Sequence, residues 1–289
     1  ASAARTRPGR PRALILVPTR ELAVQVAETV EYLADAVRLR VMTVFGGVRY
    51  TAQLRRLERG VDIVIATPGR LEDLIEQGAL TLGGVEVVVL DEADLMADMG
   101  FLPPVTRLLE QTPPGQRMLF SATLDSDVQV VVDRFLQDPF VHSVDEERST
   151  PDTRHLLLLV TMANKAAIVR ELSSGGGRTL LFTRTKTFAE RLARELNEAG
   201  ISAAELHGNL RQAGRQRNLA AFADGSVSVL VATDIAARGI HVDDIGLVVH
   251  VDPPGDPKAF LHRSGRTSRA GAEGTVVTLS TKIQNKLVR

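Results

Sequence analysis

Short apolar runs alternate with amphipathic stretches along the whole chain. The clearest run, Val-Val-Val-Leu at residues 87–90, has no polar interruption, which predicts a strand buried on both faces. Between Leu22 and Leu33 the apolar residues instead recur at helical spacing, which predicts a helix over residues 20–36. Strands that alternate with helices favour a parallel sheet with right-handed crossovers, so the predicted fold class is α/β.

The alternation occurs twice, on either side of a charged, proline-bearing segment that is typical of a linker. A length of 289 residues also suits two domains of ordinary size. We therefore predict a first domain over residues 1–143, a linker over 144–153 and a second domain over 154–289. The expected strands lie at residues 13–17, 41–45, 62–66, 87–90 and 117–120, and then at 155–160, 179–182, 203–206, 227–231, 246–251 and 274–279.

Composition excludes several modes of binding. The formal net charge is zero, which argues against gripping nucleic acid by bulk basicity but leaves local arginines and backbone amides available for phosphates. Aromatic residues make up only 4% of the chain, so a stacking platform for bases is not expected. The absence of cysteine excludes disulfides and thiolate metal sites and is compatible with a reducing cytoplasm. No apolar run approaches the roughly 20 residues that span a bilayer, so no membrane segment is expected.

Two adjacent carboxylates, Asp91 and Glu92, directly follow the apolar run at residues 87–90. Ligands of open α/β sheets sit at the carboxyl ends of the strands. Paired acids at such a place suit a divalent cation that carries nucleotide phosphates, because one can hold the metal and the other can accept a proton from water. An acidic helix N-terminus, which the helix dipole favours, explains the same two residues. Alone, they leave both interpretations open.

The other expected strands of the first half also end in small, polar or glycine-containing turns. Such turns expose backbone N–H groups, which bind phosphates without net charge. One of them is ordinary turn chemistry, but five in one sheet are hard to assign to turns alone. These turns are Pro18-Thr19-Arg20, Gly46-Gly47, Thr67-Pro68-Gly69-Arg70 and Ser121-Ala122-Thr123, and Asp91-Glu92 is the fifth.

The second half contains a basic run from His262 to Arg269. Within it, Arg266 and Arg269 stand three residues apart, so they can share a helical face or flank a turn. The run is either a solvated basic loop or a pair of arginine fingers that reach a transferring phosphate.

The order and spacing of these motifs resemble those of DEAD-box RNA helicases, from about residue 12 to the end of the chain. The resemblance implies two RecA-like parallel-sheet domains in tandem. It rests on Pro18-Thr19-Arg20-Glu21-Leu22-Ala23, Thr67-Pro68-Gly69-Arg70, Asp91-Glu92-Ala93-Asp94, Ser121-Ala122-Thr123, Ala232-Thr233-Asp234 with Ala237-Arg238-Gly239, and the run from His262 to Arg269.

The resemblance implies RNA-stimulated hydrolysis of ATP, with Mg²⁺, coupled to local unwinding of short duplexes or remodelling of RNA–protein complexes. Asp91 would hold the metal, and Glu92 would orient and deprotonate the water. The remaining nucleotide-binding residues would be Gly239, His241, Arg266 and Arg269, the two arginines acting as fingers on the γ-phosphate. The residues that couple ATP to domain closure would be Asp94, Ser121, Thr123 and His262.

The resemblance also implies that RNA is held through its sugar-phosphate backbone. A monomer in the cytoplasm is expected, and the preference for Arg over Lys favours a GC-rich bacterial genome. The implied RNA-binding residues are Thr19, Arg20, Gly46, Gly47, Thr67, Gly69 and Arg70 in the first domain, and Gly208, Gln212, Arg215 and Thr233 in the second.

The sequence departs from the family pattern at three places. His241 replaces an Asp near the expected ATP ribose, and Ser268 replaces a Gly between the fingers, so we expect altered nucleotide affinity. The family's adenine-reading Gln segment and Gly-Lys-Thr phosphate loop are both missing, and the first lysine of the chain is Lys165. We therefore expect an N-terminally truncated helicase whose first domain lacks the phosphate-loop strand and which is deficient in ATP hydrolysis. The alternatives are a non-catalytic RNA-binding or scaffold module of the same fold, and a DNA helicase, which the RNA-type motifs disfavour.

Overall fold

The computed structural model describes residues 6–143, 153–237, 242, 244–268, 273–282 and 284. The chain divides into two compact units, Ala1–His142 and Ser143–Arg289. Each unit is built on one parallel sheet, which confirms the prediction of two parallel α/β domains.

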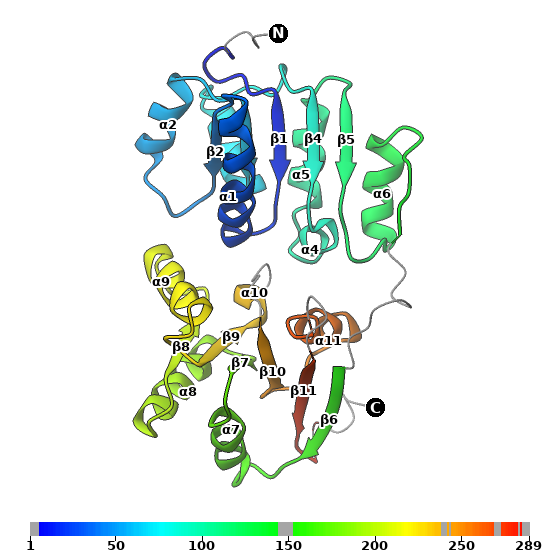
Figure 1. Ribbon diagram of the computed structural model, residues 1–289. Helices are drawn as coiled ribbons and strands as arrows, with labels where there is room; N and C mark the ends of the chain where they lie inside the picture. Colours follow the sequence, from blue (N-terminus) through cyan, green and yellow to red (C-terminus); the bar gives the residue numbers. More distant parts are fainter. Residues whose placement is uncertain are drawn as a thin grey trace. The chain divides into compact units, whose positions relative to one another are not determined.

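The first unit has a five-stranded sheet among its described residues, in the order β2-β3-β1-β4-β5, with every neighbouring pair parallel (Figure 1). The last residues of the strands are paired with one another, so the turns that follow them meet at a single carboxyl edge. The strands are β1 (Ala13–Leu16), β2 (Val41–Val44), β3 (Ile63–Ala66), β4 (Val87–Leu90) and β5 (Gln116–Leu119). The helices are α1 (Arg20–Ala36), α2 (Tyr50–Glu58), α3 (Pro68–Glu76), α4 (Ala93–Asp98), α5 (Leu102–Glu110) and α6 (Ser126–Phe135).

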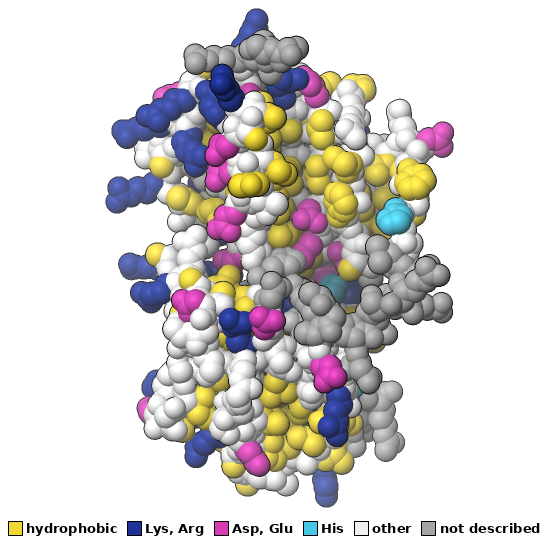
Figure 2. Space-filling view, in the orientation of Figure 1, with side chains coloured by type: hydrophobic (Ala, Val, Ile, Leu, Met, Phe, Trp, Pro, Cys, Tyr) yellow, Lys and Arg dark blue, Asp and Glu magenta, His cyan; other side chains and the backbone are white. Residues whose placement is uncertain are grey.

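The two faces of this sheet are covered unequally. Val88 and Leu90 of β4 are buried in the main core, where residues of α3, α5 and α6 pack. Val87 and Val89, on the other face of β4, are only half-buried, so the prediction of burial on both faces is wrong for this strand. The helix on that face, α1, packs on β2 and β3. Figure 2 accordingly shows hydrophobic side chains at the surface over β4 and β5, and Phe120 at the end of β5 is 56% exposed.

The second unit has a six-stranded parallel sheet in the order β6-β11-β10-β7-β9-β8 among its described residues. Two apolar cores, one containing Leu181 and Val249 and the other Leu180 and Val248, explain the uninterrupted apolar runs of its strands. The strands are β6 (Thr153–Leu159), β7 (Arg178–Thr183), β8 (Ala203–Leu206), β9 (Val229–Thr233), β10 (Ile245–His250) and β11 (Gly274–Ser280). The helices are α7 (Lys165–Ser173), α8 (Lys186–Glu198), α9 (Gln212–Ala223), α10 (Asp234–Ala237) and α11 (Pro257–Ser264).

Every strand expected from the sequence has a counterpart in the two sheets, with boundaries that differ by at most a few residues. Among the described residues, no helix combines the length and the apolar character that crossing a membrane requires.

Candidate functional site

The acid pair lies where β4 reaches the carboxyl edge of the first sheet. The backbone N–H of Asp91 donates to the carbonyl of Leu16 (3.0 Å), which extends the pairing of β4 with β1. The N–H of Glu92 then donates to Oδ1 of Asp91 (3.0 Å). Glu92 has φ +50° and ψ +55°, a left-handed conformation that a residue with a Cβ adopts at a cost of about 1–2 kcal/mol. Backbone strain of this kind is concentrated at functional sites, where it aims a side chain.

Three of the predicted coupling residues contact one another next to this pair. The N–H of Asp94 donates to Oγ of Ser121 (3.2 Å), and the hydroxyl of Ser121 donates to the carbonyl of Thr123 (2.6 Å). The hydroxyl of Thr123 donates to Oδ2 of Asp94 (3.3 Å). The start of α4 is therefore tied to the turn after β5. The fourth predicted coupling residue, His262, lies on α11 of the second unit.

Two guanidinium groups flank the glycine turn after β2. A Cβ on Gly46 would lie 3.3 Å from Nη2 of Arg20 and 4.0 Å from Nη2 of Arg70, and a Cβ on Gly47 would overlap the guanidinium of Arg20. Gly47 also has φ +81°, which favours glycine. Thr19, another predicted RNA-binding residue, is buried, and its Oγ1 accepts the N–H of Leu22 (3.2 Å) as the N-cap of α1. The turn is thus a small basic cradle with exposed backbone.

Gln53 holds this cradle together, and no sequence motif points to it. Its side chain is 5% exposed, its Nε2 donates to the carbonyl of Phe45 (3.1 Å), and its Oε1 accepts Nη1 of Arg70 (3.1 Å). Nε of Arg70 also lies 3.4 Å from Oδ2 of Asp73, and the guanidinium of Arg70 lies over the ring of Tyr50.

The turn after β3 is fixed beside the turn after β2, because the N–H of Thr67 donates to the carbonyl of Val44 (2.9 Å). A Cβ on Gly69 would meet nothing within 4 Å, which leaves its backbone open to close approach.

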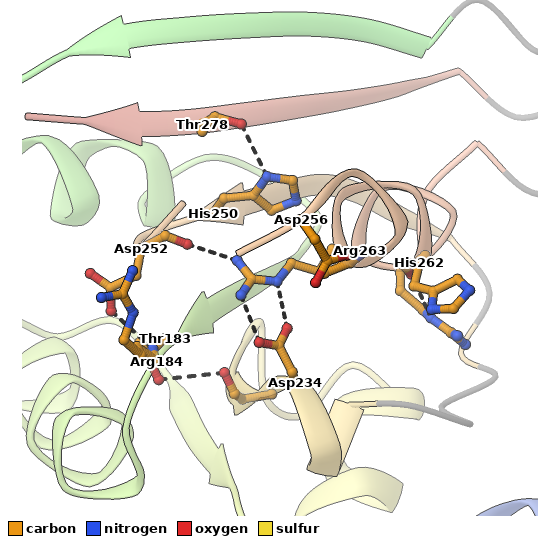
Figure 3. A network of polar contacts seen from close by, with 12 residues as sticks. Thr183, Arg184, Asp234, His250, Asp252, Asp256, His262, Arg263 and Thr278 are labelled. Carbon is orange, nitrogen blue, oxygen red and sulfur yellow. Dashed lines mark hydrogen bonds and ion pairs between the residues drawn. The ribbon is translucent and has the colours of Figure 1, made fainter. Parts of the chain in front are cut away.

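A buried ion pair organises the corresponding edge of the second sheet (Figure 3). Arg263 of α11, which is 4% exposed, donates through Nε and Nη2 to the two carboxylate oxygens of Asp234 (2.5 and 2.7 Å). Its Nη1 donates to the carbonyl of Asp252 (2.7 Å), and its guanidinium lies over the ring of Phe182. The carboxylate of Asp252 accepts Nζ of Lys165 (2.9 Å) and the N–H of Arg184 (2.9 Å). The network therefore joins α11 to the ends of β7, β9 and β10.

Several predicted residues of the second unit lie at the ends of its strands or on the helices that follow them. Thr233 ends β9 immediately before Asp234, and Arg266 follows α11 with its Nε donating to the carbonyl of His262 (3.2 Å). Gln212 and Arg215 lie in the first turn of α9, and Nη1 of Arg215 reaches the carbonyl of His207 (3.4 Å) next to Gly208. These side chains thus gather at the carboxyl edge of the second sheet, as the acid pair and the cradle do in the first unit.

The comparisons with known proteins decide the family. The model of the family described as DEAD/DEAH box helicase matches residues 1–131, and the one described as Helicase conserved C-terminal domain matches residues 163–271. The chain is 41% identical over 279 residues to the ATP-dependent RNA helicase RhlB of Pseudomonas syringae pv. tomato, covering 94% of this chain and 70% of that protein. The chain belongs to the DEAD-box RNA helicase family.

Other similar proteins extend the comparison of this DEAD-box chain. The chloroplastic DEAD-box ATP-dependent RNA helicase 3B of Zea mays is 42% identical over 292 residues, which cover 98% of this chain but 39% of that protein. Of solved structures, Saccharomyces cerevisiae Dbp5 bound to RNA and ADP BeF3 superposes with a TM-score of 0.85 at 26% identity, covering 98% of this chain and 75% of that one. Mss116p bound to ssRNA and AMP-PNP gives a TM-score of 0.84 at 27% identity, covering 98% and 61%.

Three predicted nucleotide residues of this DEAD-box chain, Gly239, His241 and Arg269, lie outside the described residues. Ser268, which stands where the family pattern has a glycine, is described and has φ +56°. That left-handed conformation explains why glycine suits the position. The hydroxyl of Thr153 donates to Oγ of Ser268 (2.8 Å), which ties the turn to β6.

Asp91 is the one side chain predicted to hold the metal ion. In the described parts of the chain, no group of three or more His, Asp or Glu side chains is arranged to hold a metal ion. Mg²⁺ that carries nucleotide phosphates keeps several waters and needs only one or two protein carboxylates. Asp91 at the end of β4 fits that role, and Glu92 beside it fits that of a base. For the β- and γ-phosphates, however, the sequence has no Gly-Lys-Thr loop.

Proposed function

We propose that this chain forms the core of an ATP-dependent RNA helicase, in which ATP hydrolysis is stimulated by RNA and drives local strand separation or remodelling of RNA–protein complexes. One observation carries the proposal. The strained Glu92, its neighbour Asp91 and the basic cradle of Arg20, Gly46, Gly47 and Arg70 all lie at the carboxyl edge of one sheet. A structural scaffold gains nothing from holding a glutamate in a left-handed conformation at that edge.

The proposed role of each residue follows from the chemistry of its side chain. Bound Mg²⁺ would neutralise charge on the phosphates. The carboxylate of Asp91 would hold that ion, and the carboxylate of Glu92 would orient the attacking water and accept its proton. Arg266 and Arg269 would offset the charge that develops on the γ-phosphate, with Gly239 and His241 near the rest of the nucleotide. The bonds among Asp94, Ser121 and Thr123 would carry a change at the acid pair to the turn after β5, and His262 is proposed to join this coupling from the second unit.

RNA is the proposed partner because the cradle offers what a sugar-phosphate backbone needs. Guanidinium groups and exposed glycine amides bind phosphate oxygens without reading bases. Gly69 with Thr67 adds open backbone in the first unit, and Gly208, Gln212, Arg215 and Thr233 are the proposed contacts of the second. The monomeric state and the cytoplasmic and bacterial origin stay predictions. The chain spans about two fifths of the length of the maize relative, so activities of a whole protein are part of this proposal.

Two glycine substitutions test the RNA-binding proposal. Gly47→Ala and Gly78→Ala both place a Cβ at a positive φ, which costs about 1 kcal/mol of unfolding free energy in each case. Only the Cβ at residue 47 displaces Arg20, since a Cβ at residue 78 meets nothing within 4 Å. We expect Gly47→Ala to weaken binding of a labelled oligouridine RNA about tenfold, measured by fluorescence anisotropy, and Gly78→Ala to change it less than about twofold. Equal affinities for the two variants would contradict RNA binding at the cradle.

Phosphate release tests the catalytic half separately. Because no Gly-Lys-Thr loop is present to hold the β- and γ-phosphates, we expect the chain as printed to release phosphate from ATP no faster, with or without RNA, than its Glu92→Gln variant. RNA-stimulated turnover that disappears in Glu92→Gln would show that the loop is dispensable. RNA binding without turnover is also what the alternative, a non-catalytic RNA-binding module, predicts.

A further inference from the structure

A pocket lies at the amino edge of the first sheet, opposite to the edge that carries the acid pair and the cradle. Three segments that lead into neighbouring strands form it, namely residues 8–10 before β1, the second half of α2 before β3, and residues 78–81 before β4. Its volume is about 460 Å³, within the range of about 300–1,000 Å³ that ligand pockets have. None of the described residues that the proposed function uses lines it.

The floor of this pocket is apolar. Leu57 and Leu80 are 2% and 3% exposed and belong to the main core of the first unit, and Leu54 packs against that core. An aliphatic side chain that enters the pocket therefore exchanges water for aliphatic contacts, which is favourable. The described lining contains no aromatic ring, so a nucleobase has nothing to stack on there.

Gly9 joins the walls of the pocket. Its N–H donates to the carbonyl of Leu57 (3.3 Å), and its carbonyl accepts the N–H of Thr81 (2.9 Å). Gly9 has φ +65°, and a Cβ on it would lie 2.8 Å from the carbonyl oxygen of Ala79, so this close approach requires glycine. The walls are thus held in place before a ligand binds, which lowers the entropic cost of binding.

Four exposed arginines form a rim around the pocket. Arg10 lines it, and Arg7 belongs to the same turn, because the N–H of Arg10 donates to the carbonyl of Arg7 (3.1 Å). Arg55 and Arg59 each directly follow a lining residue of α2 in the sequence. Figure 2 accordingly shows dark blue side chains gathered over α2 and the start of the chain.

This arginine rim is available to an anionic ligand. In the part of the chain that the structure describes, no ion pair involves any of the four side chains. The helix dipole favours Arg55 in the last turn of α2, but it does not account for Arg7 and Arg10, which precede β1. Positive charges from two segments that converge on one pocket indicate a ligand with several negative charges.

Glu58 indicates which kind of anion fits. Its exposed carboxylate lines the pocket beside the arginines. It can accept a backbone N–H of a peptide, whereas a phosphodiester has no N–H to donate and would be repelled by the carboxylate. Together with the aliphatic floor, Glu58 therefore favours an acidic peptide over a nucleic acid.

We infer that the pocket binds a short acidic peptide segment of a partner protein. One aliphatic side chain of the segment, such as a leucine, enters between Leu54 and Ala79, and the carboxylates that flank it pair with the arginine rim. This docking site does not depend on the proposed RNA-binding and catalytic function, because it lies at the opposite edge of the sheet.

Binding of a fluorescein-labelled peptide, Glu-Asp-Glu-Leu-Glu-Asp-Glu, to the full chain tests this inference by fluorescence anisotropy. We expect saturable binding, and about tenfold weaker binding when serine replaces the leucine, because serine has no apolar side chain to bury. Arg10→Glu should raise the Kd of the leucine peptide about tenfold, since it replaces an attraction with a repulsion. Arg49→Glu is the matched control, because it makes the same charge change at the exposed N-cap of α2, and its effect should stay below about twofold.

Three results would overturn the inference. The first is a lack of saturable binding of the leucine peptide, and the second is an equal affinity of that peptide for Arg10→Glu and Arg49→Glu. The third is displacement of the peptide by oligouridine RNA, together with an equal loss of RNA and peptide binding in Arg10→Glu, because the pocket would then bind RNA. Arg55→Glu repeats the measurement if Arg10→Glu lowers the thermal midpoint of unfolding.

Discussion

Replacing Arg263 with methionine is expected to destabilise the second unit by about 3 kcal/mol. The substitution keeps an unbranched apolar stem over Phe182 but leaves the carboxylate of Asp234 without its two charged hydrogen bonds. Removing one partner of a buried pair costs about 3–5 kcal/mol, and the lower end applies because the side chain of Asp234 is 34% exposed. Urea unfolding followed by far-ultraviolet circular dichroism measures the loss.

Arg191→Met is the matched control for this prediction. Arg191 pairs with Glu195 at 3.5 Å on the exposed surface of α8, and an exposed pair contributes less than about 1 kcal/mol. The double variant Asp234→Asn with Arg263→Met should cost less than the sum of the two single changes, because the second change removes a group that the first has already left unpaired. If Arg263→Met is no more destabilising than Arg191→Met, the ion pair does not organise this edge of the sheet.

Acidification is expected to lower the free energy of unfolding of the second unit, because the unfolded chain protonates His250 more readily than the folded chain does. This residue is fully buried on β10, hydrogen-bonded through Nδ1 to Oγ1 of Thr278 (3.0 Å) and packed against the rings of Phe182 and Phe260. Burial lowers the pKa of His250 to about 3, with smaller contributions from the positive charges of Arg263 and His155. The folded chain therefore keeps this imidazole neutral at pH values where the unfolded chain protonates it.

The sign of the effect follows from linkage. The folded pKa lies below the unfolded value of about 6.5, so the contribution of His250 is complete above pH 6.5 and is lost as the pH falls toward 3. Each pH unit within that window costs about 1.4 kcal/mol, which amounts to about 2 kcal/mol at pH 5. His250→Phe should remove this part of the pH dependence, while replacement of the exposed His142 with glutamine should leave it intact. Urea midpoints at several pH values that fall equally for His250→Phe and the parent chain would contradict the assignment.

The sequence was sufficient to predict the strands and most of the residues at their carboxyl edges, because both depend on local chemistry. An apolar run that ends in Asp91-Glu92 or Gly46-Gly47 carries its own evidence within a few residues. The left-handed conformation of Ser268 agrees with its standing at a glycine position of the family. Such positions can be found without knowing what packs against them.

Pairings between distant elements could not be predicted in this way. Arg263 belongs to a basic run in the sequence, and nothing local distinguishes it from Arg266, yet the fold buries it against Asp234, 29 residues away. Gln53 likewise has no motif, and it matters because α2 brings it between Phe45 and Arg70. The prediction that β4 is buried on both faces is wrong for the same reason, since the sequence of an apolar strand does not encode which helix will cover it.

The surroundings of Arg266 favour contact of its guanidinium with a charged ligand over a neutral one. Its side chain is 9% exposed, so it has already given up most of its hydration, and its Nε donates to a neutral carbonyl, that of His262, at 3.2 Å. In the proposed contact with a phosphate, Nε of Arg266 would exchange this neutral acceptor for an anionic one without stripping a full water shell, and charge-assisted bonds are roughly twice as strong. The gain in hydrogen-bond strength grows with the negative charge of the ligand. In the proposed function, a highly charged polyphosphate would draw Arg266 away from the carbonyl of His262, whereas a neutral ligand would leave that hydrogen bond in place.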